Sequence, residues 1–425
     1  MSRRRTAALA AATIAIAVLF SALAAEIAYR GWIYLSNQQN FARLAQGEGL
    51  TIGVYDRSHW EYDARHGFRY PPGRKIAYSH IQHGRLTGCA MLDTINARGN
   101  IGPIRGDYDS ADLKVLVFGD SFPAFIRDGM TFPAKLQDEL AARTGEDVHV
   151  VNFGRDGTGI LQIVDLAADR IAEWRPDLAV ITFTTDDLSR VRIWRAVTEI
   201  DGQPRVLTTT EPDPSPTPES GADTYLLEPR ADAAWCQETV AKGGEGPLVD
   251  SLIERYGKLA QQANYTMGGL TDPTRSFLLS RLLYGDPFAD GARFQVPRLR
   301  IDDFMEDPGF RDSIARIRDS GVPFVLVHLP IYPEVTDGMA PQFRGPDAAL
   351  WDSLEAAAGQ KVRSLLSVWP EDLEDPARIN NAPTDYHPSP FGMQVIATAI
   401  ADILQRDGLL PAGNPAVSGG RAEEP

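Results

Sequence analysis

Apolar runs of strand length alternate with polar loops and helical patterns along this chain, and this alternation limits the fold more than any other feature. The runs lie at residues 114–118, 148–153, 178–183, 322–328 and 362–368. Short continuous apolar runs are typical of strands that are buried on both faces of a parallel sheet. Because helical patterns separate these runs, the sequence predicts an α/β fold. We expect a three-layer α/β/α sandwich with a central parallel sheet of about five strands.

Shifts in composition divide the chain into four parts. We expect a signal anchor or transmembrane helix at residues 1–30 and an extension of short strands and loops at 31–110. An α/β domain with an insertion at 196–308 is expected at 111–408, and a disordered tail at 409–425. The insertion contains helical patterns near Leu248–Gln262 and Arg275–Leu283, and residues 208–220 are rich in Pro, Ser and Thr, which indicates an exposed loop.

The N-terminal segment has the composition of a membrane helix. Three arginines, Arg3 to Arg5, precede an uncharged run of 20 residues from Thr6 to Ala25. At about 1.5 Å per residue this run crosses a hydrocarbon core of about 30 Å. The arginines favour a cytoplasmic N-terminus, which predicts a single-pass protein of the inner membrane whose C-terminal domain faces the periplasm or the cell exterior. A cleaved signal peptide ending near Ala22–Ala24 is the alternative, and the length of the run favours the anchor.

Charge and cysteine content exclude several classes of protein. The formal net charge is −15, from 57 acidic and 42 basic residues, which argues against a nucleic-acid-binding surface. The two cysteines, Cys89 and Cys236, are too few for a disulfide framework or an all-cysteine metal site. One disulfide and two separate buried thiols both remain open. We expect no metal and no cofactor, because the acidic pair Asp186 and Asp187 has no His or Cys cluster beside it.

Three residues that follow predicted strands carry the chemistry. Ligands bind beyond the carboxyl ends of strands in a parallel α/β sheet. After the first strand, Ser121 in Gly-Asp-Ser is a candidate nucleophile, although these residue types are also common in turns and caps. After the second strand, Gly157 can bring its amide close to a substrate oxygen; the glycine spacing of residues 154–159 reverses the dinucleotide-binding fingerprint.

A histidine near the C-terminus completes the candidate set. His387 lies two residues after Asp385, at the start of an amphipathic helix that has Ser389 as its predicted N-cap. A loop histidine with a nearby carboxylate can act as a general base with an orienting partner. A loop histidine without any role is the ordinary alternative.

Taken in chain order, these residues resemble the SGNH (GDSL-type) hydrolase superfamily, whose fold is flavodoxin-like. That family has Ser in Gly-Asp-Ser after the first strand, Gly after the second, Asn after the third, and an Asp/His pair near the C-terminus. The resemblance covers about residues 111–190 and 320–406 and is closer to the membrane-anchored bacterial branch, which has an upstream Asn-x-x-Gly element like Asn96–Gly99. It implies a catalytic set of Ser121, His387 and Asp385, and an oxyanion hole at Ser121, Gly157 and Asp186.

Two positions depart from the family pattern. Asp186 stands where the family has an oxyanion-binding Asn, and an ionised carboxylate cannot donate a hydrogen bond. Losing one such donor typically lowers the rate by about 10²- to 10³-fold. In addition, the usual Asp lies three residues before the His, where this chain has Thr384, so that Asp385 is one position closer.

The resemblance implies a serine esterase or O-acyltransferase that works through an acyl-serine intermediate. The expected substrates are acyl esters, above all acetyl esters, of a cell-envelope or exported glycan, and the envelope polysaccharide machinery is the expected partner. The alternative is an SGNH-fold subunit that binds a glycan or assembles with that machinery and has weak or no turnover. Asp186 favours this alternative, whereas the presence of both Ser121 and His387 favours catalysis.

Overall fold

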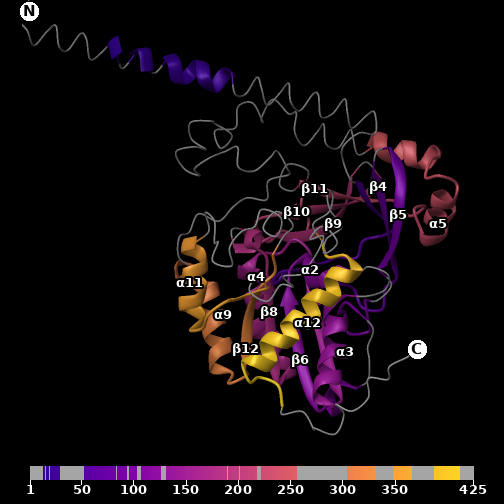
Figure 1. Cartoon of the computed structure of the whole chain (residues 1–425). Helices are drawn as coiled ribbons and strands as arrows, with labels where there is room; N and C mark the ends of the chain where they lie inside the picture. Colours follow the sequence, from indigo (N-terminus) through magenta and orange to yellow (C-terminus); the bar gives the residue numbers. More distant parts are fainter. Residues whose placement is uncertain are drawn as a thin grey trace, which may run out of the picture. The chain divides into compact units, whose positions relative to one another are not determined.

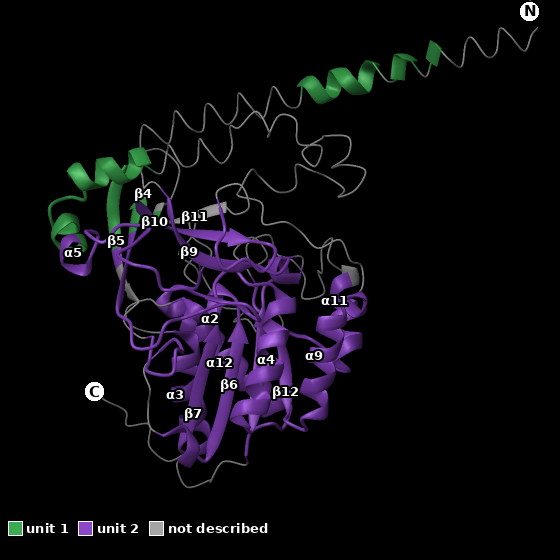
Figure 2. Cartoon of the chain, turned by 180° about the vertical axis from the view of Figure 1, so that it is seen from behind, with its two compact units in different colours: residues 1–53, 80–88, 236–295 green, residues 54–79, 89–235, 296–425 purple. Residues whose placement is uncertain are grey.

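The structure of the protein is a computed structural model of the whole chain (Figure 1). The structure describes residues 13–14, 16–18, 20–28, 52–82, 84–92, 95–102, 107–125, 131–188, 190–200, 202–217, 222–255, 304–330, 348–365 and 387–411. The chain divides into two compact units (Figure 2). The smaller unit comprises residues 1–53, 80–88 and 236–295, and the larger comprises residues 54–79, 89–235 and 296–425.

The larger unit contains the predicted parallel sheet. Its five strands are β6 (Leu113–Gly119), β7 (Val148–Gly154), β8 (Leu178–Phe183), β12 (Phe324–His328) and β13 (Arg363–Ser364). The strand order is β13-β12-β8-β6-β7, and every recorded pairing in this sheet is parallel. Numbered along the chain, this is the flavodoxin-like order 2-1-3-4-5, which confirms the expected fold class.

The central strands are apolar because both of their faces are covered. In β6, Leu116 and Phe118 join one hydrophobic cluster, while Val115 and Val117 join the cluster on the opposite face, and all four side chains are 0% exposed. Side chains of a strand alternate between its two faces, so a strand covered on both sides must be apolar at every position. The continuous apolar runs of the sequence are explained by this double burial.

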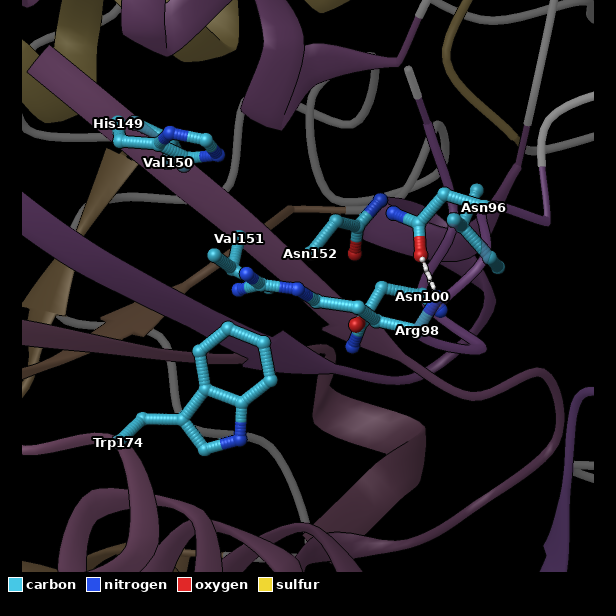
Figure 3. Close-up of a pocket in the computed structure, with 9 residues that line it drawn as sticks. Asn96, Arg98, Asn100, His149, Val150, Val151, Asn152 and Trp174 are labelled. Carbon is cyan, nitrogen blue, oxygen red and sulfur yellow. Dashed lines mark hydrogen bonds between the residues drawn. The ribbon is translucent and has the colours of Figure 1, made fainter. Parts of the chain in front are cut away.

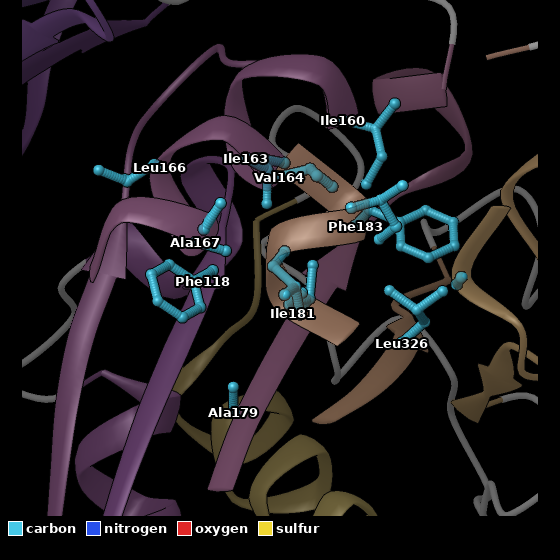
Figure 4. Close-up of a cluster of buried hydrophobic side chains, with 14 of the residues drawn as sticks. Phe118, Ile160, Ile163, Val164, Leu166, Ala167, Ala179, Ile181, Phe183 and Leu326 are labelled. Carbon is cyan, nitrogen blue, oxygen red and sulfur yellow. The ribbon is translucent and has the colours of Figure 1, made fainter. Parts of the chain in front are cut away.

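Helices cover each face of the sheet. One cluster includes residues of α4 (Ile160–Trp174), α9 (Pro308–Asp319) and α11 (Ala348–Ala358). Figure 4 shows Ile160, Val164 and Ala167 of α4 beside Phe118, Ile181 and Leu326 of the sheet. The opposite cluster includes residues of α3 (Phe132–Thr144) and α12 (Pro390–Arg406). The predicted three layers are therefore present.

The last helix begins as the sequence predicts. Ser389 is the N-cap of α12, and its Oγ accepts a hydrogen bond from the Gly392 amide at 3.0 Å. Ile396, Ile400 and Leu404 recur at the four-residue interval of one helical face, and each is 2% exposed or less.

The segment after β8 forms strands that the sequence analysis did not predict. β9 (Trp194–Ile200) and β10 (Gln203–Thr209) form an antiparallel hairpin, and β10 also pairs with β11 (Ala222–Leu227). Within the larger unit, Val54 and Tyr55 of β1 (Ile52–Tyr55) pair with β11 in parallel. The helical patterns expected in the insertion at 196–308 gave no indication of these strands. β9 is buried over its first three residues and more exposed beyond them, and β10 is exposed at its start, so neither has the continuous apolar pattern of the central sheet.

Other parts of the predicted insertion agree with the sequence or lie outside the described residues. Residues 210–217 belong to no strand or helix, as expected for the Pro-rich loop, and helix is present from 247 to 255. The helical pattern at Arg275–Leu283 and the tail beyond 411 fall outside the described residues. In the 31–110 region, β2 (Glu61–Asp63) pairs with β3 (Gly67–Arg69), and β4 (Ile76–Gln82) and β5 (Arg85–Leu92) follow.

The cysteines and the N-terminus bear on the expected location. Neither Cys89 nor Cys236 is a free thiol, since both are disulfide-bonded; of the two alternatives that the sequence leaves open, the disulfide is present.

Part of the apolar run Thr6–Ala25 is described as helix, in which Ile14 and Phe20 are 64% and 68% exposed. Among the described residues no helix has both the length and the hydropathy of a membrane span.

Candidate active site

Ser121 lies at the turn between the first strand of the parallel sheet and the helix that follows. It is the first residue of α2 (Ser121–Ala124), directly after Asp120 at the end of β6. Asp120 caps this turn, because its Oδ1 accepts the Phe122 amide at 2.9 Å and its Oδ2 accepts the Ser121 hydroxyl at 3.3 Å. The strand order reverses between β6 and β8, so Ser121 lies at the position where α/β sheets of this type bind ligands.

The neighbouring strands hold this turn closely. A Cβ atom on Gly119 would lie 2.3 Å from Thr182 Oγ1 of β8, and one on Gly154 of β7 would lie 2.6 Å from the Ala124 amide nitrogen. Asn152 of β7 donates a hydrogen bond from Nδ2 to the Pro123 carbonyl at 2.7 Å. No side chain larger than hydrogen fits at either glycine without displacing these groups, so the position of the Ser121 turn is fixed by its contacts with β7 and β8.

His387 lies beside the same turn, although it is distant from Ser121 in the sequence. Its imidazole stacks on the ring of Phe125, with 4.1 Å between ring centroids and an interplanar angle of 7°. The ring of Phe122 is 5.8 Å away at 45°. Phe125 is the C-cap of α2, so both aromatic neighbours of His387 belong to the segment that begins with Ser121. Asp385, the expected orienting carboxylate, lies outside the described residues.

Gly157 follows β7 in a backbone conformation that requires glycine. Its φ angle is +76°, and a Cβ atom there would lie 2.7 Å from Nη2 of Arg195. The loop therefore brings a bare backbone close to the Arg195 guanidinium, and the role of the Gly157 amide in an oxyanion hole stays a prediction.

Asp156, the residue before Gly157, is held by a polar network that the sequence analysis did not predict. Its Oδ1 accepts hydrogen bonds from Trp60 Nε1 at 3.1 Å and from the Tyr70 hydroxyl at 2.7 Å, and its Oδ2 accepts one from Arg195 Nη1 at 3.0 Å. Burial by itself would raise the pKa of Asp156, but the Arg195 charge and these hydrogen bonds hold that pKa well below its usual value. An ionised Asp156 thus anchors the Gly157 loop to residues from the 54–79 segment and to Arg195 of β9.

The third loop of the candidate site contains two adjacent acidic residues in different surroundings. Asp186 lies in η2 (Thr185–Leu188), and its side chain is 50% exposed. Asp187 is 0% exposed and accepts the Thr184 amide at 2.8 Å. Burial and the negative charge of Asp120 raise the pKa of Asp187 well above its usual value, while the Arg190 charge opposes this rise. Asp186 is the one of the two that is accessible, at the position of the family's Asn.

His328 is a second histidine at the carboxyl edge of the sheet, and the sequence analysis gave it no role. It ends β12 and is 1% exposed. Its Nε2 lies 3.0 Å from Thr185 Oγ1, and its Nδ1 lies 3.1 Å from Ser364 Oγ. Burial lowers the pKa of His328 to about 3, so the ring is neutral and links the third loop to β13.

A small cavity lies beside β7, the edge strand of the sheet. Its volume is about 20 Å³, room for about one water molecule, and it is lined by Asn96, Arg98, Asn100, Ile101, His149, Val150, Val151, Asn152 and Trp174 (Figure 3). The Arg98 guanidinium lies 5.2 Å from the Trp174 ring centroid. The Asn96 side chain accepts the Asn100 amide, which closes the loop of the predicted Asn-x-x-Gly element.

Comparison with known proteins gives similarity at the level of structure. No family model matches the chain, and no curated protein matches it. Among solved structures, the chain is similar to a lipase/acylhydrolase from Enterococcus faecalis, with 14% identity over 71% of this chain and 99% of that chain and a TM-score of 0.34. It is also similar to LAE5, an α/β hydrolase from the metagenome of Lake Arreo, with 14% identity, coverage of 72% and 100% and a TM-score of 0.35. A third is a family 3 carbohydrate esterase from Clostridium thermocellum, with 12% identity, coverage of 70% and 99% and a TM-score of 0.29.

The topology of this chain agrees with the fold that the sequence resemblance implies. The parallel sheet has the 2-1-3-4-5 order, Ser121 follows its first strand, Gly157 its second and Asp186 its third. Among the described residues, no group of three or more His, Cys, Asp or Glu side chains is placed to hold a metal ion.

Proposed function

We propose that this protein is an SGNH-type serine esterase or O-acyltransferase. The observation that carries the proposal is the stacking of His387 on Phe125 at 4.1 Å, because Phe125 ends the short helix that Ser121 begins. A hydroxyl and an imidazole from distant parts of the sequence thereby share one edge of the parallel sheet. This is the pair that nucleophilic acyl transfer requires.

The proposed reaction begins with proton transfer from Ser121 Oγ to the imidazole of His387. Oγ forms a bond to the ester carbonyl carbon, and the carbonyl electron pair moves to its oxygen, where the Ser121 and Gly157 amides donate hydrogen bonds. The bond from carbon to the leaving alcohol oxygen then breaks, and this oxygen takes the proton from His387. Asp385 is the proposed orienting residue of the imidazole.

The second half of the reaction decides between hydrolysis and transfer. Water or an acceptor hydroxyl loses its proton to His387 and attacks the acyl-serine, and Ser121 leaves with the proton returned. The two activities share the same acyl-enzyme. We propose acyl esters of a cell-envelope or exported glycan, acetyl esters foremost, as the substrates.

We also propose that residues 1–30 anchor the protein in the inner membrane and that the α/β domain faces the periplasm or the cell exterior. The support is the arginine-flanked apolar run, together with the disulfide-bonded state of Cys89 and Cys236, which is typical of oxidising compartments. Partner proteins of the envelope polysaccharide machinery follow from this placement.

The test compares wild-type and Ser121→Ala full-length protein in detergent. We expect the wild type to hydrolyse p-nitrophenyl acetate and to be labelled by a fluorophosphonate probe, and we expect Ser121→Ala to lose the label and at least about 10³-fold in kcat. Equal labelling of the two proteins would refute the proposal. His387→Ala should lower kcat to a similar extent, since nucleophile and base act as a unit.

A glycan-binding or assembly subunit with weak turnover is the second candidate, and the carboxylate of Asp186 at the donor position favours it. This candidate predicts that an O-acetylated polysaccharide binds equally to wild-type and Ser121→Ala protein in isothermal titration calorimetry, with no acetate released. Release of acetate by the wild type alone would decide for the enzyme.

A further inference from the structure

We propose that Arg190 supplies the positive charge that stabilises the oxyanion, in place of the Asn that this chain lacks at position 186. The inference rests on the proposed acyl-transfer function and deepens it. It assigns a catalytic role to a residue outside the family motifs.

The Arg190 guanidinium contacts a residue from each of these loops. In the first loop, Nη1 lies 3.4 Å from Asp120 Oδ2, the same oxygen that accepts the Ser121 hydroxyl. In the second loop, Nη1 lies 3.4 Å from the carbonyl oxygen of Thr158, the residue after Gly157. In the third loop, Nη2 lies 4.0 Å from Asp186 Oδ2. The guanidinium therefore lies at the junction of the loops that contain Ser121, Gly157 and Asp186.

The two terminal nitrogens of Arg190 have different surroundings. Within the described residues, the hydrogen bonds of Arg190 all come from Nη1, including one to Asp187 Oδ1 at 2.6 Å. Nη2 faces Asp186 at a distance too long for a hydrogen bond. Nη1 therefore fixes the guanidinium in place, while the N–H groups of Nη2 remain able to donate to an oxygen that becomes negative during the reaction.

The close ion pairs of Arg190 involve one terminal nitrogen. Nη1 lies 2.6 Å from Asp187 Oδ1 and 3.4 Å from Asp120 Oδ2, whereas Nη2 lies 4.0 Å from the half-exposed Asp186. The Arg190 side chain is 20% exposed, which keeps its field partly shielded from water. A guanidinium stays protonated throughout the accessible pH range, and its hydrogen bonds to an anion are about twice as strong as neutral ones. Arg190 thus supplies the donor that the Asp186 carboxylate cannot.

The experiment measures kcat and KM for p-nitrophenyl acetate in full-length Arg190→Gln, Arg190→Lys, Asp186→Asn and the double variant Asp186→Asn/Arg190→Gln. Arg192→Gln is the matched control, because Arg192 also bridges two carboxylates, Asp165 and Asp307, but these lie on α4 and at the start of α9. Circular dichroism and thermal unfolding verify the fold of each variant.

We expect Arg190→Gln to lower kcat by about 10²- to 10³-fold with KM changed less than about threefold. Arg190→Lys keeps the charge for Asp120 but has one compact donor group, so we expect a loss of about tenfold. Asp186→Asn restores an amide donor and should raise the kcat of Arg190→Gln at least about tenfold. Arg192→Gln should keep kcat within about twofold.

Several results would overturn the inference. If Arg190→Gln does not fold, Arg190→Lys decides, and wild-type kcat in that variant contradicts the role of Arg190. Failure of Asp186→Asn to rescue Arg190→Gln contradicts the inference as well. An arginine that replaces the missing donor predicts that an amide at position 186 restores turnover, whereas a purely structural arginine predicts no rescue. Ser121-dependent turnover that survives Arg190→Gln refutes this inference alone, whereas turnover that survives Ser121→Ala refutes the proposed function and the inference with it.

Discussion

The carboxylate of Asp156 gives the sharpest test of how the Gly157 loop is held. Asp156→Asn keeps the size of the side chain and an oxygen that can accept from Trp60 and Tyr70. It removes the negative charge of Asp156 that pairs with Arg195. The Arg195 side chain is 3% exposed, and its guanidinium lies 4.5 Å from the Phe68 ring centroid. The guanidinium then remains buried without a counter-charge at Asp156.

The expected cost follows from the burial of the two partners. Breaking a buried ion pair by removing one partner costs about 3–5 kcal/mol. Because the Asp156 side chain is 18% exposed, we expect a value at the lower end, about 3 kcal/mol. The control is Glu61→Gln, which breaks the exposed pair with Arg69 (37% and 62% exposed) and should cost less than about 1 kcal/mol.

The pH dependence of stability adds a second measurement. Burial raises the pKa of Asp156, but the Arg195 charge and the hydrogen bonds outweigh it, so the pKa is lower in the folded state than in the unfolded state. The stabilisation is therefore complete above the unfolded-state pKa of about 3.9 and is lost as the pH falls below it. Urea unfolding at pH 7 should show the full difference between wild type and Asp156→Asn, and the difference should shrink below about pH 4. A difference under 1 kcal/mol at pH 7, or one that is independent of pH, would refute the reasoning.

Two further predictions concern other residues of the candidate site. Gly157→Ala should lower kcat for p-nitrophenyl acetate at least about tenfold, because the new Cβ meets Arg195 Nη2 and displaces the amide. The control is Gly145→Ala, which should leave kcat unchanged because Gly145 has a similar φ of +74° but no atom within 4 Å of its Cβ. Equal effects in the two variants would contradict the prediction. His328 has a pKa of about 3 in the folded state and 6.5 in the unfolded state, so the unfolded chain binds the proton first as the pH falls. The free energy of unfolding of the wild type should therefore fall by about 1.4 kcal/mol per pH unit below about pH 6.5, relative to that of His328→Gln. Parallel stability curves from urea unfolding between pH 7.5 and 4.5 would count against this.

The central sheet could be predicted because double burial leaves a simple pattern in the sequence. The runs at 114–118, 148–153 and 178–183 differ from β6, β7 and β8 by at most one residue at either end. Each of these strands is apolar over most of its length since helices cover both faces. The runs themselves do not give the order of the strands; only the flavodoxin-like fold of the resembled family implies it.

The β9–β10 hairpin was missed although the sequence contains its turn. Ile200 pairs with Gln203, and Gly202 has a φ of +72°. In the sequence, Gly202 follows Asp201. An Asp-Gly pair between alternating segments is a strong hairpin signal. The alternation is weak here because β10 is exposed at its start and contains Pro204.

The polar contacts of the site could not be read from one sequence. The hydrogen bonds of Trp60 and Tyr70 to Asp156 join segments that are 96 and 86 residues apart. A buried polar contact between distant segments leaves no periodic signal, unlike the apolar face of a helix or strand. Arg190 was missed for the same reason, since its partners Asp120 and Thr158 belong to other loops.

The anchoring of Asp156 by Trp60 and Tyr70 sets a lower limit on the length of a useful recombinant fragment. A fragment starting at residue 111 would retain all five parallel strands, and the positions of the family motifs alone would suggest this start. It would lack both of these hydrogen-bond donors and the Phe68 ring beneath Arg195. Fragments for purification and crystallisation should therefore begin no later than residue 54, because residues that precede the first parallel strand hold the Gly157 loop that follows the second.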